Sequence, residues 1–246
     1  MSRSRLCAGC GTFLYLRYVK LPVMHQAIVE QILEYPDAYL IMQQIQAALS
    51  EERRQREAFY NDITDEYKVE FINGEIVMHS PVKKMHNEST KYLCELLDLY
   101  VRKHKLGFVG IEKIMTALTR NDYEPDICFF GRAKSDQFGK KQTLFPAPDL
   151  VVEVLSEGTA KRDRGIKYDD YEAHGVGEYW IVDADAGVIE QYHLVDGQYE
   201  LVLKAAEGHI RSVALPGFAI PIQAIFDEAV NMQTMAIILQ GQPPAQ

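Results

Sequence analysis

The most unusual residue of the chain is a glutamate inside an apolar run. Residues 150–155 read Leu-Val-Val-Glu-Val-Leu, a pattern typical of a central strand covered on both faces. Burying Glu153 there is costly unless the carboxylate is paired or binds a metal ion. Because side chains alternate along a strand, Asp149 shares a face with Glu153. The run therefore indicates either a metal-binding carboxylate or a buried salt bridge to an arginine.

A second carboxylate enters another apolar segment. Asp126 follows Pro125 at the start of the segment 127–130, where an aspartate can also simply cap a turn. If the two strands are neighbours, Asp126 and Glu153 converge at one end of a sheet. Such oxygen ligands suit Mg²⁺ or Mn²⁺, with further positions left to water and a phosphate.

The polar segment 159–174 supplies cations. Lys161, Arg164 and Lys167 recur every third residue and share approximately one face of a predicted helix. Lys167 precedes the more apolar part of this helix, so it can lie at the edge that faces the sheet. A cation there could activate water or offset the charge of a phosphodiester transition state. The alternative is a solvated surface lysine.

Hydrophobic periodicity predicts the elements that must position these residues. Helices are expected over 23–60, interrupted at Pro36-Asp37, and over 84–104, with His86 in the first turn. Alternation around Asn73-Gly74 predicts a hairpin over 67–78. Other strands are expected at 108–118, 127–130, 150–155, 178–183, 188–194 and 199–204. This order predicts an α/β (α+β) fold with a mixed β-sheet between helices.

Composition restricts the class of protein. The chain has 246 residues and a formal net charge of −9, which does not provide the basic footprint of most nucleic-acid binders. A membrane span and a signal peptide are both missing from the pattern, so we expect a cytoplasmic protein. Cys7 and Cys10 are interpreted as part of a poorly ordered leader rather than a zinc or redox site, and Cys94 and Cys128 as core thiols.

Several blocks of sequence together resemble one known family. The distinctive stretch comprises Pro148–Ser156, Thr159-Ala160, Arg162-Asp163, Lys167, Tyr171, Gly175-Val176 and Glu178–Asp183. It resembles the Uma-type family of restriction endonucleases, which belongs to the PD-(D/E)XK nuclease superfamily. Earlier blocks that match are Asn73–Ile76, His86 and Pro125–Ile127. The resemblance covers approximately residues 56–230.

The resemblance implies a restriction-endonuclease-like fold that hydrolyses DNA with a divalent metal ion. Asp126 would be the first acid and Glu153 the second, both as metal ligands. Glu75, in the predicted hairpin, would be the auxiliary acid. The superfamily places its lysine two residues after the second acid, where this chain has Leu155, so Lys167 would replace it. His86 becomes a possible substrate-side group, and Asp149 a possible auxiliary one.

These inferences define three segments and three hypotheses. Residues 1–55 are expected to be an extension that is largely helical from about 24, residues 56–230 the nuclease-like domain, and 231–246 a C-terminal tail. The leading hypothesis is a Mg²⁺- or Mn²⁺-dependent endonuclease acting on DNA, as a homodimer if both strands are cut. The alternatives are an inactive nuclease-fold binding or assembly module, favoured by the acidic charge and Leu155, and a phosphate-ester hydrolase for a smaller substrate. The target sequence stays open.

Overall fold

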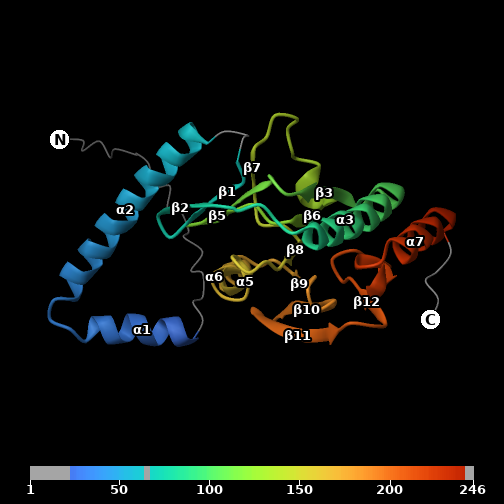
Figure 1. Cartoon of the computed structure of the whole chain (residues 1–246). Coiled ribbons are helices and arrows are strands. Elements are labelled where there is room, and N and C mark those ends of the chain that lie inside the picture. The colour runs from blue at the N-terminus through green and yellow to red at the C-terminus, as the bar shows by residue number, and fades with distance from the viewer. Residues whose placement is uncertain (1–22, 64–66, 242–246) are drawn as a thin grey trace, which may run out of the picture. The chain divides into compact units, whose positions relative to one another are not determined.

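A computed structural model describes residues 23–63 and 67–241, with backbone alone for 23–25 (Figure 1). Its internal contacts divide the chain into two units, Met1–Glu51 and Glu52–Gln246. The predicted leader with Cys7 and Cys10, and residues 242–246 of the predicted C-terminal tail, lie outside the described residues. None of the described helices combines the length and the apolar character that crossing a bilayer requires.

The N-terminal extension is helical, as predicted. Helix α1 (Val23–Leu33) ends before the segment that holds Pro36, and α2 (Ala38–Asp62) begins after it. A proline removes an N–H donor and clashes with the preceding turn, which explains the interruption. The end of α2 belongs to the second unit, where Arg56 Nε donates to Asp122 Oδ2 at 2.6 Å and Phe59 packs on Phe71.

The second unit contains a five-stranded sheet that begins with the predicted hairpin. Strands β1 (Val69–Ile72) and β2 (Glu75–Met78) pair antiparallel, and Asn73 and Gly74 adopt positive φ angles of 51° and 87°. A two-residue type I′ turn requires such angles at both positions. The strand order is β2-β1-β5-β4-β7, completed by β5 (Asp122–Tyr123), β4 (Met115–Ala117) and β7 (Leu144–Phe145).

A six-stranded mixed sheet forms the centre of the unit, in the order β11-β10-β9-β8-β6-β3. Its central strand β8 (Leu150–Val154) is buried along its whole length, as the apolar run predicted, and it pairs parallel to β9 and antiparallel to β6. The remaining strands are β3 (Gly107–Ile111), β6 (Ile127–Gly131), β9 (Glu178–Asp183), β10 (Val188–Val195) and β11 (Gln198–Ala205).

The two faces of β8 contribute to different hydrophobic clusters. Leu150, Val152 and Val154 pack with Leu93 and other residues of α3 (Lys84–His104). Val151 packs with Tyr171 of α6 in a second cluster. Since Glu153 has the same parity as Val151, its side chain points to the α6 face. Helices α5 (Ala160–Asp163) and α6 (Ile166–Ala173) lie on that face, and α4 (Arg132–Ser135) follows β6 (Figure 1).

The structure differs from the predicted elements in three places. The strand expected over 108–118 is divided between the two sheets, because Glu112 takes a positive φ of 52° and turns the chain. The helix expected over 159–174 is two helices separated at Arg164-Gly165. Most of the predicted tail is α7 (Glu228–Gln240), which packs on α3 after β12 (His209–Arg211), β13 (Ala219–Pro221) and η1 (Ile222–Ile225).

Candidate active site

The pairing of β6 with β8 brings Asp126 and Glu153 together. Ile127 lies opposite Val152, so Asp126, one residue before β6, lies at the end of β8 that holds Glu153. The backbone N–H of Val154 donates to Asp126 Oδ2 at 2.8 Å and fixes this carboxylate against the strand. Two acids that are 27 positions apart in the chain therefore share one end of the central strand.

Glu153 is bound by a lysine rather than by an arginine. Its side chain is buried, and its Oε1 accepts hydrogen bonds from Lys167 Nζ and Tyr171 Oη, both at 3.0 Å. Both donors come from α6, whose residues 167 and 171 are one turn apart and so share a face. The helix after the second acid thus supplies the amine that the resemblance placed there.

Lys167 lies deep within a group of carboxylates. Its Nζ lies 2.8 Å from Glu70 Oε1, 3.0 Å from Glu153 Oε1 and 3.4 Å from Asp163 Oδ1. The ring of Tyr123 lies 5.7 Å from the same nitrogen, within the range of a cation–π contact. Burial would lower the pKa of Lys167, but its three carboxylate partners outweigh burial and raise the pKa well above its ordinary value. The amine is therefore a permanent cation.

Glu70, like Asp163, belongs to this group although it was not among the predicted site residues. It lies on β1, is buried, and its Oε1 also accepts the backbone N–H of Glu124 at 3.0 Å. Tyr67, Val69 and Phe71 alternate with polar residues, a pattern that does not mark Glu70 as buried. Instead β1 is buried on both faces, because it lies between β2 and β5 and is covered by the rest of the unit.

Glu75 does not reach the cluster. It pairs with Ile72 at the turn end of the hairpin, two residue pairs from Glu70, and its side chain is exposed. Asp149 is also separate from the cluster, since it precedes the opposite end of β8. There its Oδ2 accepts the backbone N–H of Gly131 at 2.7 Å and its Oδ1 lies 2.7 Å from Lys134 Nζ. Of the two hairpin glutamates, Glu70 is therefore the one that lies beside Lys167.

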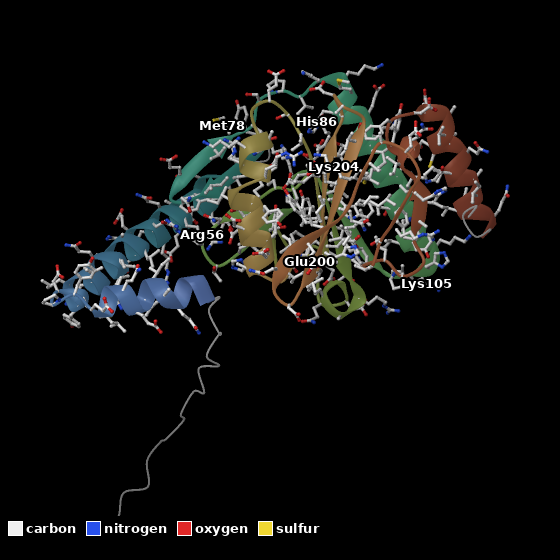
Figure 2. All side chains as sticks on the ribbon, turned by 90° about the horizontal axis from the view of Figure 1, so that it is seen from below. Arg56, Met78, His86, Lys105, Glu200 and Lys204 are labelled. Carbon is white, nitrogen blue, oxygen red and sulfur yellow. The ribbon has the colours of Figure 1, made fainter. Side chains whose placement is uncertain are left out.

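Asp126 faces a second lysine and a histidine. Lys68 Nζ lies 2.7 Å from Asp126 Oδ1, and His86 Nε2 lies 3.5 Å from Oδ2. His86 is in the first turn of α3 (Figure 2), and its Nδ1 is buried without a hydrogen-bond partner among the described residues. Burial alone would raise the pKa of Asp126, but Lys68 and His86 outweigh it, so the pKa is lowered and the carboxylate is anionic.

The charges of the cluster do not balance. Burial raises the pKa of Glu153 to about 8, and the neighbouring Asp163 and Asp126 add to this, although Lys167 opposes it. Burial likewise raises the pKa of Asp163. For Glu70, burial is outweighed by Lys167 and His79, which lower the pKa to about 2. Glu153 and Asp163 thus retain a proton more readily than ordinary carboxylates.

This imbalance fits a divalent cation. Four buried carboxylates, Glu70, Asp126, Glu153 and Asp163, face two lysines and the two histidines His79 and His86. With the histidines counted as neutral, full ionisation leaves an excess of negative charge. A proton on Glu153 relieves that excess, and a metal ion that displaces the proton relieves it as well. Hard oxygen donors are what Mg²⁺ and Mn²⁺ prefer.

The side chains provide only part of a coordination shell. Within residues 23–63 and 67–241, no three His, Cys, Asp or Glu side chains converge as a complete metal centre. An ion at this site would draw on Asp126 and Glu153 and complete its shell with water and phosphate oxygens. Mg²⁺ commonly binds in this way, through one or two carboxylates together with substrate phosphates.

The mixed sheets, the flanking helices and the acids at the end of β8 define a restriction-endonuclease-like fold. The chain belongs to the Uma2 family, whose model matches residues 51–223 and carries the description "Putative restriction endonuclease". The predicted resemblance is therefore confirmed. Families of this kind generally use divalent metal ions.

Two relatives support the assignment. The uncharacterized protein sll1609 of Synechocystis sp. is 30% identical over 132 residues, which cover 52% of this chain and 73% of the relative. A crystal structure from Anabaena variabilis, described as "a putative nuclease belonging to DUF820", superimposes with a TM-score of 0.61 at 16% identity. It covers 70% of this chain and 96% of its own. At that identity the likeness establishes the fold alone.

Proposed function

We propose that this protein is a divalent-metal-dependent endonuclease that hydrolyses phosphodiester bonds in DNA. The observation that carries the proposal is the convergence of Asp126 and Glu153 at one end of β8, within a buried cluster of carboxylates. Membership of the Uma2 family supports the same activity. We also propose that the enzyme acts in the cytoplasm.

In this proposal Asp126 and Glu153 hold Mg²⁺ or Mn²⁺. Such an ion, when bound, makes water a stronger nucleophile near neutral pH and offsets charge on the phosphate. In the hydrolysis, the oxygen of water bonds to phosphorus as the bond from phosphorus to one sugar oxygen breaks. One hydrogen of the water ends on that sugar oxygen, which gives a phosphate monoester and an alcohol.

The residues around the acids keep them in position. Lys167 and Tyr171 both donate to Glu153 Oε1, so that this oxygen is fixed while Oε2 receives no hydrogen bond from the described residues. The backbone N–H of Val154 fixes Asp126 Oδ2, and Lys68 contacts Asp126 Oδ1. His86, which approaches Asp126 Oδ2 at 3.5 Å, is placed as a group on the substrate side.

The acidic charge of the whole chain shapes how DNA would bind. A net charge of −9 opposes the approach of DNA, so divalent ions at the site must offset part of this repulsion. We expect weak affinity in the absence of metal and a steep loss of affinity with salt. We also propose a homodimer, since two sites related by a two-fold axis cut both strands of a duplex most simply.

Plasmid cleavage tests the proposal. Supercoiled plasmid is incubated with Mg²⁺, with Mn²⁺ or with EDTA, beside the isosteric variants Glu153→Gln and Asp126→Asn. We expect metal-dependent nicking by the wild type and a loss of about 100-fold or more in both variants. Glu200→Gln, on the exposed face of β11 (Figure 2), is the matched control and should cleave as the wild type does.

The alternatives have different outcomes in the same experiment. The net charge of −9 and Leu155 at the superfamily's lysine position favour a module that binds without cutting. Mn²⁺ binding by calorimetry with intact plasmid would support that module. Hydrolysis of a small aryl phosphodiester, again with intact plasmid, would support a hydrolase for smaller substrates. If Mn²⁺ does not bind, the Glu153–Lys167 pair is structural and the endonuclease proposal is wrong.

A further inference from the structure

The two lysines of the cluster differ greatly in exposure. The side chain of Lys167 is 1% exposed, whereas that of Lys68 is 20% exposed. The acids follow the same gradient, because Asp126 beside Lys68 is more exposed than Glu153 beside Lys167. A phosphate that enters from solvent therefore meets the side of the cluster formed by Lys68 and Asp126 first.

The charge of Lys167 is shared by three buried carboxylates. Its Nζ donates a hydrogen bond to Glu153 Oε1 and lies 2.8 Å from Glu70 Oε1 and 3.4 Å from Asp163 Oδ1. Turning one N–H towards a phosphate would leave a buried carboxylate without its counter-ion. Removing a partner from a buried charge is strongly unfavourable. Lys167 is thus not available to bind a phosphate.

Lys68 has three N–H donors and a single carboxylate contact among the described residues, and its backbone is held by the hairpin. Its carbonyl oxygen accepts the backbone N–H of His79 at 3.1 Å, which continues the β1–β2 pairing by one residue. Its ammonium group contacts Asp126 Oδ1, its one carboxylate partner among the described residues. The long, flexible stem of a lysine allows the charge to move by several ångströms while the backbone stays in place.

We propose that Lys68 is the catalytic residue that contacts the scissile phosphate, and that Lys167 is a positioning residue that holds Glu70, Glu153 and Asp163. This inference rests on the proposed endonuclease function. If a metal ion were bound by Asp126, the Lys68 ammonium group would leave Oδ1 and would donate to a non-bridging oxygen of the phosphate. There it would stabilise the negative charge that develops as water attacks phosphorus.

The experiment compares Lys68→Met, Lys68→Arg and Lys167→Met in the full chain, with Lys91→Met on the exposed surface of α3 as the matched control. Three quantities are measured: cleavage of a duplex oligonucleotide with Mn²⁺, the affinity for Mn²⁺ alone by calorimetry, and the thermal midpoint. Lys68→Met should cleave about 100-fold more slowly, bind Mn²⁺ more tightly because a competing cation is gone, and melt near the wild-type temperature. Lys68→Arg should recover part of the rate.

Lys167→Met should instead lower the thermal midpoint, because three buried carboxylates lose their shared cation. A Lys68→Met variant that cleaves at the wild-type rate would overturn the inference and leave the proposed function intact. A Lys68→Met variant that is slow because it melts well below the wild type would also overturn it. A wild type that does not cleave the duplex with any divalent ion would overturn the proposed function, and this inference with it.

Discussion

Glu153 and Glu178 are buried glutamates on adjacent parallel strands, and their surroundings are opposite in kind. Glu178, at the start of β9, is surrounded by neutral donors: its Oε1 accepts from Trp180 Nε1 at 2.8 Å and Gln191 Nε2 at 2.6 Å. Its Oε2 accepts from Ser212 Oγ and from the backbone N–H groups of residues 213 and 214, at 2.6–3.1 Å. Glu153 instead shares one lysine with two other carboxylates.

The difference separates a structural carboxylate from one that can take up a cation. Five donors to Glu178 occupy its lone pairs, so they fasten the segment after β12 to β9 and leave no direction open for a metal ion. Burial raises the pKa of Glu153 to about 8, and the neighbouring carboxylates Asp163 and Asp126 add to this although Lys167 opposes it. Burial alone therefore does not indicate function, whereas burial with unbalanced charge does.

The largest expected effect is on the free energy of unfolding, when Glu178 and Glu153 are each replaced by glutamine. Glu178→Gln directs an amide NH₂ at donors that need an acceptor, so the free energy of unfolding should fall by about 2–4 kcal/mol. Glu153→Gln removes one of the competing carboxylates, while Lys167 keeps two others, so stability should change by less than about 1 kcal/mol. Urea denaturation followed by circular dichroism measures both.

Glu200→Gln, on the exposed face of β11, controls for the substitution itself. The contrast between the two glutamates is wrong if Glu153→Gln destabilises the protein as much as Glu178→Gln does. In that case Glu153 would be as structural as Glu178, and the endonuclease proposal would lose its main support.

A third buried carboxylate allows a test by pH. Glu190, on β10, binds Arg164, Lys204 and Tyr192, and although burial opposes the change, these partners lower its pKa to about 2 from 4.5. A lowered pKa stabilises the folded state fully above about pH 4.5, and this stabilisation is lost as the pH falls towards 2.

The expected contribution of Glu190 is about 1–2 kcal/mol, reduced by the solvent exposure of its basic partners. Glu190→Gln should lose this amount at pH 7 and show a flatter stability profile between pH 5 and 2. Thermal melts across this pH range measure it. An unchanged stability profile would show that the ion pairs of Glu190 are screened and make no net contribution to the free energy of unfolding.

The smallest expected effect is a difference in cleavage rate between variants of the two hairpin glutamates, Glu70 and Glu75. Glu70→Gln weakens one contact of Lys167 and should slow DNA cleavage about 10-fold, since the positioned lysine loosens. Glu75→Gln changes an exposed residue at the turn and should cleave at the wild-type rate. Single-turnover rates with Mn²⁺ compare the two. A slower Glu75→Gln with a normal Glu70→Gln would return the auxiliary role to Glu75.

Local patterns were sufficient for much of the fold. The turn at Asn73-Gly74, the proline between α1 and α2, and the apolar run of β8 each act within a few residues, and the structure bears them out. Local patterns did not predict the elements whose form depends on packing against segments far away in the chain. The strand expected over 108–118 divides between two sheets at Glu112, and the segment 228–240 forms a helix that packs on α3.

The sequence alone determined which carboxylates are anomalous. An acid within an apolar strand is costly wherever the strand lies, so Glu153 could be singled out without coordinates. Only the tertiary structure decided which charged side chains surround Glu153. Glu70, which no local pattern marked, is buried beside Lys167, and Glu75, five residues later, is exposed. Periodicity reports which face of an element a residue occupies, but the electrostatic partners on that face come from segments far away in the chain.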